Sequence, residues 1–396
     1  MRTGQMRRFS ALLIVLALGG CSGLGLERDE AVPQASLQSA SVLGMPNGRF
    51  VIDEGAPRGM IDEFVSARER SRQYDRSIKR KAPPVNVLAL SGGGDNGAFG
   101  AGLLIGWSAH GTRPQFQGVT GVSTGALIAP FAFLGPRYDP ALKDVFTTIT
   151  ADDIVKKRSL LGAFTEDAAA DSAPLYNLIS KYVTEDMVAE IAREYERGRL
   201  LFIGTTQLDA GRQVIWNIGA IAKSGDPGAP EMIRRILLAS ASIPAAFPPV
   251  MLTVSDNGKT YQELHVDGGA VSQTFLYPPE LVAKRERSRV SRNAYIIRNG
   301  RRWQGHEEIK RSTFSVAKRA ISVLIDSNAA GDLYRIYATT KRDGIGFNLA
   351  LIEDDFTTPH ADEFDKAYMN KLFDYAYEKA RHGYAWRKAP PGFAAL

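Results

Sequence analysis

A short glycine-flanked turn carries the residue with the clearest chemical potential in this chain. The stretch "GVSTG", residues 121–125, places Ser123 between two glycines in the pattern G-x-S-x-G. In this pattern a serine occupies a sharp turn between a strand and a helix, where its hydroxyl is exposed as a nucleophile. Because a chain of this length contains such a match by chance roughly one time in four, the motif needs support from its surroundings.

A run of glycines lies upstream, within "LSGGGDNGAFGAG" at residues 90–102. A serine that attacks an ester creates a negatively charged oxygen, and each backbone amide aimed at that oxygen is worth about 3 to 4 kcal/mol. Gly92, Gly93 and Gly94 offer such amides with no side chain in the way. We therefore interpret these three residues as an oxyanion hole.

Nucleotide binding is the competing interpretation of the glycine run. Gly92, Gly94 and Gly97 satisfy the dinucleotide pattern G-x-G-x-x-G. That pattern expects an acidic residue at the end of the next strand, where this chain has the serine turn. A phosphate loop of the Walker type would need a lysine, which is absent from this stretch.

The serine needs a base, and "HVDGG" at residues 265–269 offers one. Asp267 ends an expected strand, and burial would raise the pKa of its carboxyl toward that of a useful base. The sequence therefore predicts a Ser123–Asp267 dyad, while His265 is interpreted as a hydrogen-bonded strand residue. A Ser-Asp-His arrangement using His306 or His360 stays open, although neither histidine has a recognisable flanking motif.

These groups can meet only if the surrounding elements form a suitable scaffold. The pattern of strand, glycine turn, helix, strand, serine turn and helix predicts an α/β fold with a largely parallel central sheet. Further expected elements include strands at "RLLFIGTTQL", "RQVIWNIG", "ELHVDGG", "AYIIRNG" and "GFNLALI" and helices at "EMIRRILLASASI" and residues 312–340. We expect one catalytic domain over residues 85–384, followed by a tail at residues 385–396.

The N-terminus is typical of an exported protein. Positive charge followed by a short apolar core over residues 1–20 predicts a signal peptide rather than a spanning helix. The sequence up to Cys21 resembles a bacterial lipobox, which implies a lipidated cysteine and, with Ser22, an outer-membrane location in the cell envelope. Residues 21–84 are polar and are interpreted as a lipid-anchored tether with surface helices.

Composition limits the remaining possibilities. The chain has 396 residues, 44% of them hydrophobic, and a formal charge of +6, part of which lies in the signal peptide. This mild balance does not favour a nucleic-acid partner. The paired aspartates at residues 152–153 and 354–355 lack the spacing of a calcium loop, and the histidines are scattered. We expect no metal and no cofactor, and the sequence leaves protein partners unknown.

Four motifs together resemble the patatin-like phospholipase family. They are Gly92-Gly93-Gly94-x-x-Gly97, Gly121-x-Ser123-x-Gly125, "ASASIPAAFPPV" from Ala239 to Val250, and Asp267-Gly268-Gly269. The resemblance implies a three-layer α/β/α hydrolase fold in which Ser123 is the nucleophile, Asp267 the base and the glycine run the oxyanion hole.

The same resemblance implies the substrate class and leaves one departure to explain. The substrate would be a phospholipid or another fatty-acyl ester at a membrane surface. Many relatives carry a cation where this chain has Asn96, so a role of that cation in holding a substrate phosphate is not expected here. The alternative is a catalytically inactive envelope lipoprotein that uses the hydrolase fold as a binding module.

Overall fold

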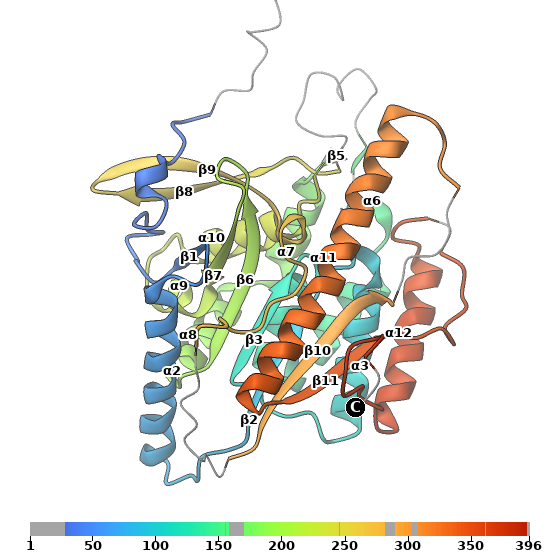
Figure 1. Cartoon of the computed structure of the whole chain (residues 1–396), viewed down its shortest axis with the longest axis horizontal. Helices are drawn as coiled ribbons and strands as arrows, with labels where there is room; N and C mark the ends of the chain where they lie inside the picture. Colours follow the sequence, from blue (N-terminus) through green and yellow to red (C-terminus); the bar gives the residue numbers. More distant parts are fainter. Residues whose placement is uncertain are drawn as a thin grey trace, which may run out of the picture.

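The computed structural model describes residues 28–154, 156–157, 170–244, 246–281, 290–302, 308–360 and 362–393. Within these ranges the main sheet has the strand order β1-β7-β6-β3-β2-β10-β11, with β9 paired to β6 and β8 paired to β9 (Figure 1). The strands are β1 (Arg49–Ile52), β2 (Val85–Leu90), β3 (Gly118–Val122), β6 (Leu200–Gln207), β7 (Arg212–Asn217), β8 (Val250–Asp256), β9 (Lys259–Asp267), β10 (Arg292–Arg301) and β11 (Gly346–Ile352). A separate short pair joins β4 (Lys156–Lys157) to β5 (Ala170–Asp171).

The centre of the sheet is parallel. Neighbouring strands are parallel along the series β6-β3-β2-β10-β11. The pairs β1–β7, β6–β7, β6–β9 and β8–β9 are antiparallel. Parallel strands need helical crossovers, and these cover the faces of the sheet. The expected largely parallel sheet is confirmed.

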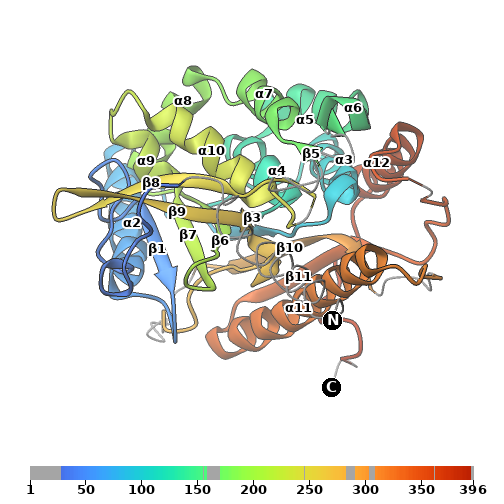
Figure 2. The same ribbon diagram turned by 90° about the horizontal axis from the view of Figure 1, so that it is seen from above.

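Helices cover both faces of the sheet, as Figure 2 shows from above. One layer contains α3 (Gly97–Ala109), α4 (Thr124–Leu134), α5 (Asp139–Thr147), α6 (Ala151–Ile154), α7 (Ala173–Tyr182), α8 (Glu185–Glu196), α9 (Ile218–Lys223), α10 (Ala229–Ala241) and α12 (Lys366–Arg381). The opposite layer contains α2 (Arg58–Ser77) beside β1 and α11 (Thr313–Asp343) beside β10 and β11. The molecule is therefore a three-layer α/β/α fold.

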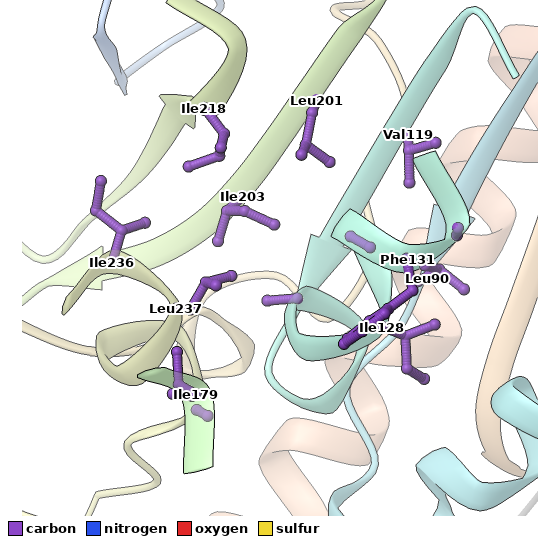
Figure 3. Close-up of a cluster of buried hydrophobic side chains, with 14 of the residues drawn as sticks. Leu90, Val119, Ile128, Phe131, Ile179, Leu201, Ile203, Ile218, Ile236 and Leu237 are labelled. Atoms are coloured by element: carbon purple, nitrogen blue, oxygen red, sulfur yellow. The ribbon is translucent and has the colours of Figure 1, made fainter. Parts of the chain in front are cut away.

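Alternation along β6 explains how the two layers are held. Leu201 and Ile203 face α10, where Ile236 and Leu237 pack against them (Figure 3). Phe202 points to the other face and joins a separate cluster with residues of β1 and α2. Each such side chain contributes roughly 1.5 to 3 kcal/mol on full burial, so a strand that is apolar on both faces favours the middle of three layers.

The N-terminal segment differs from the expected tether. Val32, Leu37 and Val42 are buried in the main core, and β1 pairs with β7 at the edge of the sheet. The expectation of a tether is therefore wrong for residues 32–52, whereas α2 is a helix as expected. A four-residue strand is too short to show a clear alternating pattern, which is why the sequence did not reveal it.

The expected C-terminal tail is also largely incorporated into the domain. Trp386 packs against Trp107 with ring centroids 4.8 Å apart, and Arg387 forms a backbone bridge with Leu349 of β11. The boundary at residue 385 is therefore wrong for residues 385–391. Cys21 and the expected signal peptide lie outside the described residues, and no helix among the described ones is long and apolar enough to cross a membrane.

Candidate active site

Ser123 occupies the strained turn that the sequence predicts. It lies between β3 and α4 with φ 55° and ψ −129°, a region that residues other than glycine rarely adopt. A side chain at Gly121 would collide with the carbonyl of Gly125, and one at Gly125 would collide with the carbonyl of Leu90. The two glycines therefore allow the chain to turn sharply at Ser123, directly after β3. Backbone strain of this kind is concentrated at functional sites.

Asp267 reaches the same edge of the sheet by a different route. β9 runs antiparallel to β6 and pairs Asp267 with Thr205, one residue beyond the pairing of Val122 with Gly204. The strand therefore ends where β3 ends. The Ser123 hydroxyl donates a hydrogen bond to the Asp267 carboxyl, and the Gly269 amide donates another to Oδ1 at 2.7 Å.

The carboxyl of Asp267 lies in a dry environment. The residue is 2% exposed, and burial raises its pKa from the ordinary 3.8 to about 6, although the hydrogen bonds from Ser123 and Gly269 pull in the opposite direction. A carboxylate that holds its proton more tightly is a stronger base toward a hydroxyl. The arrangement can thus accept a proton from Ser123 while remaining ionised at neutral pH.

The end of α10 holds both residues through the backbone. The Ser123 amide donates to Ser240 Oγ at 3.0 Å, and Ser240 Oγ donates to the carbonyl of Gly204 at 2.7 Å. Two residues later, the carbonyl of Ser242 accepts from the Asp267 amide at 2.8 Å. The third motif of the sequence, "ASASIPAAFPPV", therefore fixes the spacing between the serine turn and the aspartate turn, a role that its composition did not reveal.

The glycine run lies beside Ser123, between β2 and η2 (Gly94–Asn96). Gly93 has φ 155°, and a side chain there would collide with the carbonyl of Asn299. The Gly92 amide is occupied by a long hydrogen bond of 3.4 Å to the carbonyl of Gln273. Among the described residues the amides of Gly93 and Gly94 have no hydrogen-bond acceptor, so these two are the better placed to receive a negative charge.

Asn299, near the end of β10, fixes the start of this turn. Its Nδ2 donates to the carbonyl of Ser91 at 2.8 Å, and its Oδ1 accepts from the Gly100 amide of α3 at 3.1 Å. Its own amide donates to Ser91 Oγ at 2.9 Å. Sequence reasoning missed this residue because it lies about 200 positions from the glycines it holds and belongs to no motif.

Two further residues close to the dyad were missed. Gln273 places its amide between Gly92 and Gly269, where a side chain on either glycine would collide with it. Asp332 of α11 is 1% exposed, and its Oδ2 accepts from the amides of Gln273 and Thr274 at 2.7 and 2.9 Å. The loop after the aspartate turn is therefore fastened to the opposite helix layer.

The histidines do not reach Ser123 in the part of the chain that the structure describes. His360 Nε2 bonds to Asp95 Oδ2 at 2.7 Å, and His306 lies outside the described residues. His265 is fully buried and bonds to Glu263 and Thr205, as expected for a strand histidine. Burial lowers its pKa, so this histidine is kept neutral. His110 ends α3.

The dyad is closed off from solvent. Ser123 is 4% exposed. Two cavities of about 170 and 470 Å³ are lined by Leu276 and Tyr277, and neither is lined by Ser123 or Asp267.

Comparison with known proteins follows this geometry. A strained serine at a strand-to-helix turn, a buried carboxyl and a glycine turn on a three-layer sheet define the class of serine hydrolase-like α/β folds. Residues 88–278 match the family model described as patatin-like phospholipase. The matched span is similar to a patatin-like phospholipase domain, and that family implies lipid acyl hydrolase activity.

The matched span begins in β2 and includes the glycine turn, Ser123 and Asp267. A search of curated protein sequences gave no significant match. Among solved structures, the chain is similar to VipD from Legionella pneumophila, with 10% identity, a TM-score of 0.36, and coverage of 93% of this chain and 73% of that one. A likeness at that TM-score adds nothing to the argument.

Proposed function

We propose that this protein is a serine lipid acyl hydrolase of the phospholipase A or lysophospholipase type that uses Ser123 and Asp267 as its dyad. The observation that carries the proposal is the placement of Ser123, in a strained strand-to-helix turn, beside the buried carboxyl of Asp267, whose pKa burial raises to about 6. A base must lie within hydrogen-bond reach of the proton it takes and must hold that proton well enough to drive the transfer.

The reaction follows from these positions. Ser123 Oγ attacks the ester carbonyl carbon while its proton passes to Asp267, and the carbonyl oxygen becomes an oxyanion. The amides of the turn at Gly92, Gly93 and Gly94, chiefly the latter two, donate to that oxyanion. The intermediate collapses as Asp267 returns the proton to the departing alcohol, which leaves an acyl ester on Ser123. Water then attacks the acyl carbonyl and gives a proton to Asp267, and Asp267 passes that proton to Ser123 Oγ as the fatty acid is released.

Labelling with a fluorophosphonate ester tests the nucleophile directly. The full-length protein should acquire one covalent adduct that maps to Ser123, and Ser123→Ala should acquire none. Ser240→Ala removes a different buried serine beside the site and is the matched control. It should still be labelled at Ser123, but more slowly. An unlabelled wild-type protein that nevertheless binds acyl lipids would support the inactive binding module instead.

The substrate class is tested by product analysis. We expect fatty acid to be released from defined phospholipid or lysophospholipid vesicles and identified by mass spectrometry. Release only from short water-soluble esters would contradict the lipid assignment while leaving the dyad intact.

Attachment to the bacterial envelope is a separate part of the proposal, supported by the lipobox-like sequence before Cys21. We propose that Cys21 is lipidated and tethers the domain to a membrane, most simply the outer membrane. Labelling of cells with a clickable fatty acid should mark the wild-type protein and not Cys21→Ser. Equal labelling of both would overturn it.

A further inference from the structure

The oxyanion turn has an unusual set of partners outside the matched span 88–278. Asp95, which directly follows the three glycines, is 5% exposed. Its Oδ2 accepts a hydrogen bond from His360 Nε2 at 2.7 Å and another from the amide of Phe364 at 2.8 Å. The carboxyl that closes the glycine turn is thus held entirely by a segment located more than 260 residues later in the chain.

The neighbouring residue of the turn is held by the same segment. Tyr368 of α12 donates its hydroxyl to Asn96 Oδ1 at 2.7 Å. The rings of His360 and Tyr368 stack with centroids 4.3 Å apart and an angle of 28° between their planes. Both side chains of η2 that follow the glycines are therefore bound by one aromatic pair.

The contact between Phe364 and Asp95 depends on an uncommon backbone conformation. Phe364 has φ 60°, a strained value for an aromatic residue, and it is in this conformation that its amide meets Asp95. Asp365 then caps α12 by accepting from the Tyr368 amide at 2.9 Å. α12 itself lies along α3, and the backbone of Phe373 comes close to Gly102 (Figure 1). The segment thus connects α12, packed on α3, to the glycine turn.

We propose that His360, Asp95 and Tyr368 form a brace that positions the amides of the glycine turn for the oxyanion. The inference rests on the proposed function, because it assigns these residues a purpose in the same reaction. His360 acts through Asp95 and is a positioning residue.

The charge state of His360 matters to the brace. The His360 ring bonds to Asp95 and stacks on Tyr368, and the hydrogen bond with Asp95, aided by the charges of Asp95, Glu363 and Asp365, raises the pKa of His360 above its usual 6.5. The charge-assisted bond is fully present below that usual value and is lost as the pH rises through the raised one. A neutral imidazole can still donate from Nε2, so the turn loosens at high pH without being released.

The test compares His360→Ala and the milder His360→Gln with His110→Ala in the full-length protein. His110 is an exposed histidine that bonds locally to Thr112. We expect kcat to fall about 10- to 100-fold in His360→Ala with KM within twofold, because a small displacement of catalytic groups costs about that much. His360→Gln should retain more activity and lose the decline of kcat at high pH. His110→Ala should match the wild type.

Hydrogen exchange separates failure of the brace from failure of the proposed function. Amides of residues 92–97 should exchange faster in His360→Ala and not in His110→Ala, whether or not any ester is hydrolysed. Unchanged exchange would overturn the brace, and so would faster exchange with unchanged kcat in an active enzyme. A fall in kcat without faster exchange would also overturn it, since His360 would then act directly on substrate. An inactive wild type in which exchange still rises would refute the hydrolase and leave the brace as a contact only.

Discussion

Residues 88–278 and residues 290–393 contribute to one site in different ways. The first region contains the groups proposed to react with an ester: the glycine turn, Ser123 and Asp267. The second supplies Asn299, Asp332 and His360, each of which binds a turn of the first region by hydrogen bonds. The difference teaches that the reacting groups lie in short motifs, while the precision of their placement depends on contacts distant in sequence.

The largest effect should come from the first region. Asp267→Asn removes the proton acceptor but can still accept the Gly269 amide hydrogen bond, and we expect kcat/KM to fall on the order of 10³- to 10⁴-fold. Asp256→Asn, at the far end of β9's hairpin, is the matched control and should leave kcat/KM unchanged. The measurement is ester hydrolysis at saturating and limiting substrate. Near-full activity of Asp267→Asn together with loss of activity in a histidine variant would favour the Ser-Asp-His alternative.

The next largest effect should come from the second region. It tests whether Asn299 holds the glycine turn in place. Asn299→Ala leaves the Ser91 carbonyl and the Gly100 amide buried without partners, at a cost of about 1 to 3 kcal/mol for each group. We expect the free energy of unfolding to fall by about 2 to 4 kcal/mol, measured by urea denaturation, with kcat reduced in the protein that remains folded. Asn370→Ala is the control, because its amide bonds only to carbonyls near the surface. If Asn299→Ala were as stable and as active as the wild type, the two regions would not be coupled as described.

Much of the first region could be predicted from sequence, and the second could not. Ser123 and Asp267 were identified because a strained turn demands glycines at fixed positions, which leaves a visible pattern. Asn299 and Asp332 leave no pattern, because a buried amide or carboxyl that binds backbone can come from any element that folds nearby. For the same reason the order of strands within the sheet, and the entry of β1 at its edge, depended on long-range pairing that periodicity does not encode.

The raised pKa of the Asp267 carboxyl should lower the free energy of unfolding of the wild type at neutral pH. Burial raises its folded pKa to about 6, so the native state holds the proton more tightly than the unfolded chain does. Stability is therefore lost as the pH rises from about 4 to about 6, and the deficit persists above that. Asp267→Asn should be more stable than the wild type by about 1 to 3 kcal/mol at pH 8 and equal to it at pH 4, measured by thermal or urea unfolding. A variant that is less stable at pH 8 would mean that the carboxylate is held for structure instead.

The smallest effect should come from the hydrogen bond between Ser240 and Ser123, which lies within the first region. Ser240 and Ser242 lie two residues apart at the end of α10, and both are fully buried. Ser240 Oγ binds the amide of Ser123, whereas Ser242 Oγ donates to the carbonyl of Leu238 within its own helix. Ser240→Ala should therefore lower kcat about 5-fold, since the serine turn loses one hydrogen bond worth about 1 kcal/mol. Ser242→Ala should lower the free energy of unfolding by about 1 kcal/mol and leave kcat unchanged. Equal kcat values for the two variants would show that the serine turn is held by its glycines and strand alone. The positioning contacts that matter to catalysis would then all come from the second region.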